Sequence, residues 1–335
     1  MNRRRFLTLA TSALSIGSLP AAVRSLAAAT QAPAGRWGGI TPNADFYITS
    51  YGRTPRVDAA EWRLKIHGLV ANPAELDLAT LKSMPPVKEM LTLECIGNPP
   101  NGSAIGNAIW VGPKLKPLLE RARPSGKAVY AALQAADGYA TGIPIDELMR
   151  EENFLPYLMN GVELPPEHGY PLRIFIPGKY GMKQPKWLTE IEFVDREFIG
   201  YWEARGWSNS AWRKVNSGFF YPQAGYSFLN LLAPQATVKA PVNMAGWALA
   251  GTSGIRRVDV STDDGATWNA AELVQNSSPY IWTVWKYSFA PRSSGHYRVR
   301  VRATDGAGRS QPTSDPDSAA GMSAQARLEL AVTSV

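Results

Sequence analysis

Residues 91–100 read LTLECIGNPP, an apolar strand-like run that passes into a Gly/Pro loop at Cys95. The end of a strand is where a rigid scaffold presents a ligand or a nucleophile, so Cys95 is a candidate functional residue. It is also the only cysteine of the chain, which excludes internal disulfides, CxxC metal sites and CxxCH haem attachment. Considered alone, a single cysteine is more often a buried small apolar residue, and no cysteine-protease signature surrounds this one.

The composition around this stretch is that of a globular protein with two domains. The chain has 335 residues, of which 45% are hydrophobic and 19% charged. A chain of this length usually forms more than one hydrophobic core. Four of its 35 Lys and Arg residues lie within the first 30 positions, so the remainder carries 31 basic against 28 acidic residues. No basic run or nucleic-acid module follows, and a nucleic-acid partner is therefore not expected.

Residues 1–30 have the pattern of an export signal, with Arg3-Arg4-Arg5-Phe6-Leu7, a modest apolar stretch and Ala27-Ala28-Ala29. The arginines followed by Phe and Leu are typical of twin-arginine signals, which export folded proteins. The alternatives are an ordinary secretory signal or an uncleaved anchor. The apolar stretch is shorter than the ~20 residues that span a bilayer. We therefore expect a periplasmic protein with no stable membrane anchor after cleavage.

Residues 31–230 mix helical and strand patterns with frequent Pro and Gly, which predicts an α+β domain. The predicted helices are residues 115–123 and 145–152, and the predicted strands are residues 63–70, 90–95, 128–135, 172–177 and 191–194.

Residues 231–335 instead show regularly spaced strands with turn residues between them, which predicts an immunoglobulin-like β-sandwich. Asp263-Asp264-Gly265 is typical of a hairpin turn. In the strand near the end, Val299 and Val301 alternate with Arg298, Arg300 and Arg302, so one face is core and the other meets solvent or a partner. The predicted strands are residues 242–250, 255–262, 267–274, 281–289, 296–303 and 326–332.

Further motifs follow the cysteine loop along the sequence. After residues 93–98 (LECIGN) come Trp110 with Gly112, Asp137-Gly138-Tyr139, Met159-Asn160-Gly161, His168-Gly169-Tyr170-Pro171-Leu172-Arg173 and Pro177 to Lys183 with Lys186-Trp187-Leu188. In this order they resemble the sulfite oxidase family of molybdopterin enzymes, whose dimerisation domain the predicted sandwich also resembles. The resemblance implies an α+β molybdopterin-binding domain followed by a sandwich that forms a homodimer.

The resemblance implies a Mo-molybdopterin cofactor with the Cys95 thiolate as the protein ligand of molybdenum, a soft donor suited to such a metal. The implied reaction is two-electron oxygen-atom transfer. Arg173 and Lys186 are suitable cations for the pterin phosphate. The positions implied to line the cofactor site are Asn43, Phe46, Tyr47, Cys95, Asp137, His168, Arg173, Gln184, Pro185 and Lys186. Without the family, the ordinary interpretations are turn residues for Asn43 and His168 and a surface ion pair for Arg173.

Two departures from the family concern the substrate. Thr49 and Pro100 stand where sulfite oxidases have arginines that hold an anion, and hydrogen bonds to charged groups contribute ~1.5–3 kcal/mol each. Trp207 falls near the position of a substrate-pocket tyrosine, and Arg205 is a candidate replacement cation. The alternative is that the tryptophans here cover a domain junction. We thus predict Cys95, Trp207 and Arg205 as catalytic residues.

Three functions stay open on these grounds. The first is a sulfite-oxidase-like enzyme acting on a small oxyanion, and the second is a sulfoxide or N-oxide reductase using the same cofactor. The third is a non-enzymatic secreted binding module on a decayed fold. For an enzyme without a CxxCH haem motif, we expect electrons to pass through an external carrier such as a cytochrome c.

Overall fold

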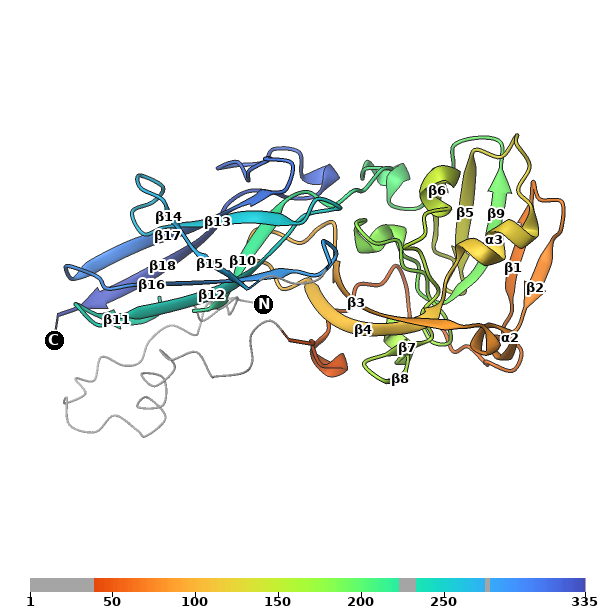
Figure 1. The fold of residues 1–335 in the computed structure, drawn as a ribbon, viewed down its shortest axis with the longest axis horizontal. Helices are drawn as coiled ribbons and strands as arrows, with labels where there is room; N and C mark the ends of the chain where they lie inside the picture. The colour runs from red at the N-terminus through yellow and green to blue at the C-terminus, as the bar shows by residue number, and fades with distance from the viewer. Residues whose placement is uncertain (1–38, 223–232, 275–277, 335) are drawn as a thin grey trace, which may run out of the picture.

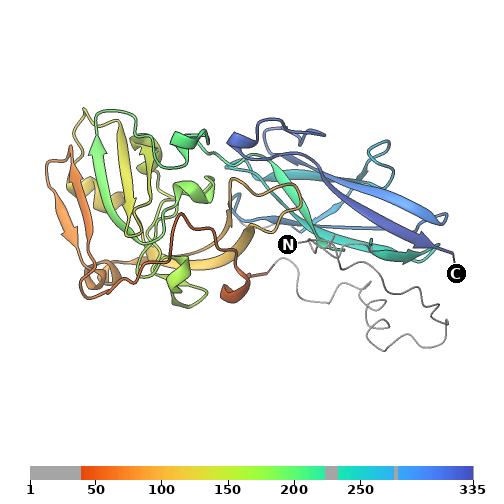
Figure 2. The ribbon, with the colours of Figure 1, turned by 180° about the vertical axis from the view of Figure 1, so that it is seen from behind.

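The computed structural model describes residues 39–222, 233–274 and 278–334, so the predicted export signal lies outside it. The described chain is rich in strands and has few helices (Figure 1). Two sheets with short helices occupy one end of the elongated molecule, and two further sheets occupy the other, as the reverse view also shows (Figure 2). Within this part of the chain, no helix is long and apolar enough to cross a membrane.

The larger sheet of the first domain has the strand order β2-β1-β9-β5-β6. Only the β1–β9 pair in it is parallel. Its strands are β1 Leu64–Gly68, β2 Ala74–Leu76, β5 Tyr130–Ala135, β6 Ala140–Pro144 and β9 Leu188–Val194, and the helices of this domain are α2 Leu78–Ser83, α3 Lys116–Ala122 and α4 Ile145–Leu148. Apolar side chains of β1, α3 and β9, including Ile66, Leu119 and Ile191, form its core.

The second sheet of this domain carries the cysteine loop. It consists of β3 Pro86–Glu94, β4 Ile105–Pro113, β7 Leu158–Met159 and β8 Val162–Glu163, in that order. The β3 strand pairs with β4 from Pro86↔Pro113 to Glu94↔Ile105, so Cys95 is the first residue beyond the ladder. The pairing thus puts Cys95 at the end of a rigid strand, where the sequence pattern predicted it.

Most predicted elements of the first domain occur, with two differences. The helix predicted over residues 145–152 ends at Leu148, and residues 172–177 form no strand. The strand prediction over residues 172–177 is wrong because these buried residues bond to separate segments: Arg173 N to Pro156 O, Ile174 N to Pro185 O and Phe175 N to Phe154 O. A buried apolar run predicts burial but not a ladder partner.

The C-terminal region is built from two sheets. One has the order β10-β12-β16-β15 and the other β11-β18-β17-β13-β14. Their inner faces meet in one core, to which Met244 and Trp285 contribute from the first sheet and Val260, Val299 and Leu328 from the second. The strands are β10 Asn216–Tyr221, β11 Gln235–Thr237, β12 Val242–Leu249, β13 Ile255–Ser261, β14 Asn269–Ala270, β15 Glu272–Val274, β16 Thr283–Phe289, β17 Gly295–Asp305 and β18 Ala326–Thr333.

The alternation predicted for the strand near the end is present in β17. Val299 and Val301 are fully buried in the sandwich core, whereas the side chain of Arg298 is 67% exposed.

One strand of the sandwich comes from the stretch assigned to the first domain. Residues of β10 pair with β12 from Asn216↔Leu249 to Tyr221↔Ala245, although β10 precedes the predicted boundary at residues 230 and 231. In the sheet β10-β12-β16-β15, β10 is the edge strand beside β12. The sandwich therefore reaches back toward the cysteine loop.

Candidate active site

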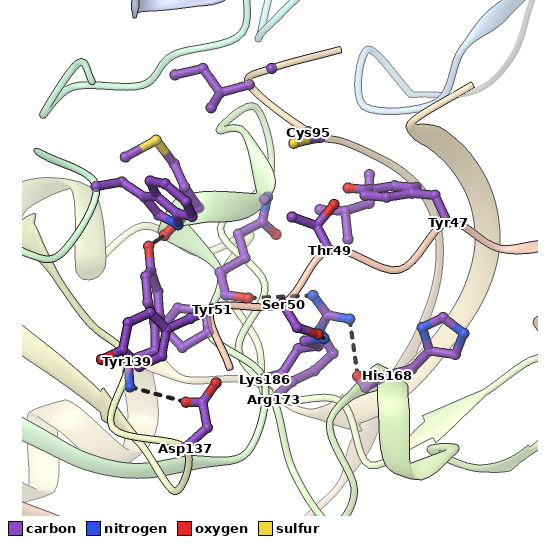
Figure 3. A pocket seen from close by; sticks show the side chains of 18 of the residues that line it. Tyr47, Thr49, Ser50, Tyr51, Cys95, Asp137, Tyr139, His168, Arg173 and Lys186 are labelled. Carbon is purple, nitrogen blue, oxygen red and sulfur yellow. Dashed lines mark hydrogen bonds between the residues drawn. The ribbon is translucent and has the colours of Figure 1, made fainter. Parts of the chain in front are cut away.

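A cavity of about 980 Å³, part of it open to solvent, lies where the cysteine loop meets four other segments. Figure 3 shows Cys95 at one end of the cavity and Asp137 at the other. Its lining consists of Phe46, Tyr47, Thr49, Ser50, Tyr51, Leu93, Cys95, Ile96, Gly97, Asp137, Tyr139, His168, Arg173, Gly181, Met182, Gln184, Pro185, Lys186, Trp187, Trp202 and Trp207.

Cys95 is partly exposed to this cavity as a free thiol. Burial raises the pKa of the thiol, while hydrogen bonds from the Gly97 backbone N–H and the Thr49 side chain act in the opposite direction. These two donors stabilise the thiolate, the form of cysteine that binds metals. Thr49, one of the two positions where an arginine was expected, is thus a neighbour of the sulfur.

Arg173 supplies a buried positive charge to the cavity. Its Nη1 donates to His168 O at 3.1 Å and its Nη2 to Gln184 O at 3.3 Å, while its Nε has no hydrogen-bond partner. Burial lowers the pKa of this guanidinium. No carboxylate of the described residues forms an ion pair with it, so a bound anion would complete its surroundings.

Lys186 brings a second cation to the same region. Its Nζ donates to Ser50 Oγ at 3.0 Å and to Glu167 O at 2.9 Å. Burial, and then the charge of Arg173, lower the pKa of Lys186 to about 8. Gly169 permits this approach, since its φ is +114° and a Cβ there would lie 3.1 Å from Lys186 and 3.2 Å from Arg173.

Three further predicted residues contribute polar groups or shape. The carboxylate of Asp137 accepts the Tyr139 N–H at 3.0 Å in the turn after β5. Buried His168 bonds to Asn43 O through Nε2 at 3.2 Å, and burial lowers its pKa. Gln184 uses its side chain to bond Ile176 N and Lys179 O, so it shapes the cavity wall.

Phe46 and Tyr47 form an aromatic wall on the side of β4. Their rings stack at 5.4 Å, and Phe46 also meets His168 edge-on at 5.5 Å. A Cβ at Gly106 of β4 would lie 2.6 Å from the Phe46 ring, so any larger residue there would force the ring to shift. Burial raises the pKa of the Tyr47 phenol, which stays neutral.

Trp202 and Trp207 close the cavity on the Cys95 side. A Cβ at Gly97 would lie 3.5 Å from the Trp207 ring, so this ring covers the loop after the cysteine. The turn between the tryptophans is held by a buried ion pair, because Lys183 Nζ bonds Glu203 Oε1. The same ammonium donates to Thr141 Oγ1 at 3.0 Å, Gly142 O at 2.9 Å and Asn209 Oδ1 at 2.7 Å.

The structure brings ten of the twelve predicted site residues to this cavity and leaves two outside its lining. Asn43 lies behind it, where its Oδ1 accepts from Asn160 Nδ2 at 2.7 Å. Arg205 points away, with its guanidinium 3.5 Å from the centroid of the Tyr201 ring. Pro100 is also absent from the lining. The placement of Arg205 gives no support to the prediction that it replaces a lost substrate cation.

Sequence reasoning missed several lining residues, among them Ser50, Tyr51 and Met182. Tyr51 contacts Tyr201 at 4.3 Å between ring centroids, and Met182 O accepts the Tyr139 hydroxyl at 2.6 Å. Ser50 and Tyr51 lie in an irregular segment with no periodicity, so no pattern marks them. Met182 stands inside a motif already noted, and its position beside Lys183 was the available signal.

The residues present fit a pterin cofactor carrying a metal. A soft sulfur donor and two cations open into one cavity, and a bound anion would satisfy the Arg173 Nε, which has no hydrogen-bond partner. The described residues contain no group of three or more His, Cys, Asp or Glu placed to hold a metal ion.

Comparison with known proteins agrees with this site. Residues 51–202 match the oxidoreductase molybdopterin binding domain, and residues 222–333 match the Mo-co oxidoreductase dimerisation domain. The chain is 32% identical over 175 residues to the uncharacterized oxidoreductase YuiH of Bacillus subtilis (strain 168), an alignment covering 51% of this chain and 86% of that protein. It is 26% identical over 325 residues to sulfite oxidase of Arabidopsis thaliana, covering 82% of each.

Two further comparisons concern a longer relative and a solved structure. Mitochondrial sulfite oxidase of Drosophila melanogaster is 28% identical over 316 residues, and the alignment covers 81% of this chain but 55% of that protein. The chain thus spans about half of that relative. The sulfane dehydrogenase SoxCD from Paracoccus pantotrophus shares the fold, with a TM-score of 0.71 at 22% identity over 92% of this chain and 87% of that chain.

The cavity and the matching domains define an oxidoreductase built around a molybdopterin-binding domain. The chain belongs to the sulfite oxidase family of molybdopterin oxidoreductases. Its cofactor is therefore Mo-molybdopterin. Because this family is a class of enzymes, the interpretation as a non-enzymatic binding module loses its basis.

Proposed function

We propose that this protein catalyses two-electron oxygen-atom transfer at molybdenum, with Cys95 as the protein ligand of the metal. The observation that carries the proposal is that the only cysteine opens into the same cavity as two cations that lack carboxylate partners among the described residues. When bound, the cofactor supplies the redox change and the site of oxygen transfer.

The chain's own residues bind and orient the cofactor in this proposal. Arg173 and Lys186 bind the phosphate, since both are cations held by backbone carbonyls with capacity left for an anion. Asp137, which lies at the opposite end of the cavity from Cys95, would accept hydrogen bonds from the pterin. Tyr47 and Trp207 exclude water from the two sides of the Cys95 sulfur.

Sulfite-oxidase-like action on an oxyanion has a competitor, reduction of an uncharged sulfoxide or N-oxide. One observation favours the competitor: the cations of the described lining are Arg173 and Lys186, while the residues around Cys95 are Thr49, Ile96 and Trp207. A dianion placed there would lack the charged donors that offset its desolvation. Sulfoxide reduction consumes two electrons and two protons and releases water, with the electrons coming from an external carrier such as a cytochrome c.

The remaining parts of the proposal concern export and assembly. The twin-arginine pattern of residues 1–30 supports export to the periplasm. The match of residues 222–333 to a dimerisation domain supports a homodimer. The two facing sheets of this region support its description as an immunoglobulin-like sandwich.

The test uses holoenzyme made in a host that synthesises the cofactor. We expect near one molybdenum per chain, and Cys95→Ser should lower turnover at least ~10³-fold because the oxygen donor replaces a soft ligand. Lys82→Gln, which removes an exposed ion pair with Glu163, is the matched control. Retained turnover in Cys95→Ser would contradict the proposal.

Assays of the same holoenzyme decide between the substrates. Reduction of methyl phenyl sulfoxide by a reduced viologen, without sulfite oxidation, supports the uncharged substrate. Rapid sulfite oxidation with an artificial acceptor supports the oxyanion.

A further inference from the structure

The loop that follows Cys95 is closed at its base by short-range bonds. Cys95 N donates to Ala104 O at 2.9 Å and Asn98 N donates to Cys95 O at 3.0 Å. The side chain of Asn98 fills the loop, where its Oδ1 accepts from Ala104 N at 2.9 Å. A Cβ at Gly102 would lie 2.3 Å from that oxygen, so the loop is tightly packed around Asn98.

The residue before the cysteine connects this loop to the sandwich. Glu94 is fully buried, and its Oε1 accepts both from Asn98 Nδ2 at 3.1 Å and from Asn216 Nδ2 at 2.7 Å. Its Oε2 lies 3.6 Å from Arg213 Nε. Arg213 also donates to Thr92 O at 3.1 Å, so it contacts the end of β3 at both Thr92 and Glu94.

The connection continues across the sandwich. Asn216 is the first residue of β10, and its Oδ1 accepts from Gln311 Nε2 at 3.4 Å. Gln311 Oε1 in turn accepts from Ser217 Oγ at 2.5 Å and from Ala303 N of β17 at 2.9 Å. The Glu94 carboxylate is therefore bonded to a group that both sheets of the sandwich hold in place.

A second hydrogen bond joins the loop to the sandwich at Asn101. Asn101 Oδ1 accepts the backbone N–H of Phe219 at 2.8 Å. Asn101 has a φ of +61°, a left-handed conformation that asparagine tolerates. Phe219 lies at a register shift between β10 and β12. The sandwich strand β10 thus holds the loop at two points, through Glu94 and through Asn101.

We propose that the sandwich domain, besides any role in dimerisation, sets the position of the cysteine loop, with Glu94 and Asn101 as positioning residues. The loop cannot move relative to the cavity without breaking the bonds to Asn216 or Phe219, and buried polar networks of this kind hold one arrangement. The proposal rests on the proposed function in that it takes Cys95 as the metal ligand. Groups that orient a ligand commonly affect the metal almost as strongly as the ligand itself.

The first test needs no metal. In cofactor-free protein, Glu94→Gln and Asn101→Gly should each raise the rate of Cys95 alkylation by iodoacetamide about three- to tenfold, because each loosens one hold on the loop. The labelling is unambiguous because the chain has one cysteine. Asn101→Gly keeps the left-handed backbone and leaves no buried charge, so it remains testable if Glu94→Gln unfolds. Lys82→Gln should label at the parental rate.

The second test uses holoenzyme. Both variants should retain molybdenum, show a shifted electron paramagnetic resonance spectrum of the partly reduced metal, and lose kcat about tenfold with KM little changed. Parental labelling rates together with an unchanged spectrum would overturn the inference. Faster Cys95 labelling in both variants, together with a parental chain that binds no molybdenum, would instead retain the loop inference and reject the proposed function.

Discussion

At the scale of single residues, Lys186 is the cation whose charge state lies within an accessible pH range. Its pKa is about 8, because burial and the neighbouring Arg173 both disfavour the ammonium form. The ammonium is present below that pH and is lost as the pH rises through it. An anion bound nearby would favour the charged form and shift the pKa upward.

The cofactor-free protein should therefore bind inorganic sulfate, whose charge is constant here, about tenfold more weakly at pH 9 than at pH 7. The fluorescence of Trp187 is a suitable probe, since the Lys186 ammonium lies 4.4 Å from its ring centroid. The Lys186→Arg variant keeps its positive charge and should bind sulfate with the same affinity at pH 7 and at pH 9. A pH-independent affinity in the parental protein would show that Lys186 does not contact the anion.

The Trp207 ring lies over the loop that follows Cys95 and lines the same cavity. Trp207→Ala should raise KM for an aryl sulfoxide about five- to tenfold, through loss of ring contact, while the molybdenum content stays unchanged. Steady-state kinetics with metal analysis measures both quantities. Trp268→Ala, a change in the sandwich, is the control, and equal kinetics in the two variants would remove Trp207 from the pocket.

At the scale of elements, the turn Glu203–Arg205 owes its position to one buried pair. Lys183 has a fully buried side chain and Glu203 is 1% exposed. Breaking a buried pair by removing one partner leaves a charge without compensation, which is costlier than replacing both partners. The pair thus links the tryptophan segment to β6 through Thr141 and Gly142.

Lys183→Met should lower the free energy of unfolding by about 3–5 kcal/mol, measured by urea denaturation. The double variant Lys183→Met/Glu203→Leu should recover most of that loss, since it removes both charges. Lys82→Gln, which removes an exposed ion pair, should lower the free energy of unfolding by less than about 1 kcal/mol. A small effect of Lys183→Met alone would mean that water reaches Glu203.

At the scale of the whole molecule, the two domains share buried polar contacts near the cysteine loop. Thr92 N donates to Tyr280 O at 3.0 Å, and Thr92 Oγ1 accepts from Trp282 N at 2.9 Å. Together with Glu94 and Arg213, these contacts join the strand that carries Cys95 to the sandwich. Unfolding either domain would expose them.

We therefore expect calorimetry to show one cooperative unfolding transition for both domains. Arg213→Met, which leaves Glu94 without its buried partner, should lower Tm and separate the transition into two. Arg196→Gln, at a side chain 79% exposed, should leave the transition unchanged. Two transitions in the parental protein would show that the domains unfold independently.

The sequence by itself determined the features that local patterns encode. The strand-to-loop change at Cys95 and the alternation of Val299 and Arg298 follow from short-range periodicity and from Gly and Pro, which act on adjacent residues. The motifs around Arg173 and Lys186 predicted residues that the structure brings to one cavity. Asn43 and Arg205 were predicted for the same site from the family resemblance, yet their side chains contact Asn160 and Tyr201 instead.

Only the tertiary structure decided which distant residues meet. Glu94 and Asn216 are 122 residues apart in the sequence and 2.7 Å apart in the fold, a contact that depends on how β10 pairs with β12. The segment of residues 172–177 is buried without a ladder, because its backbone N–H groups bond to two separate stretches of the chain, residues 154–156 and Pro185. Such contacts depend on the packing of whole elements, and no local periodicity records them.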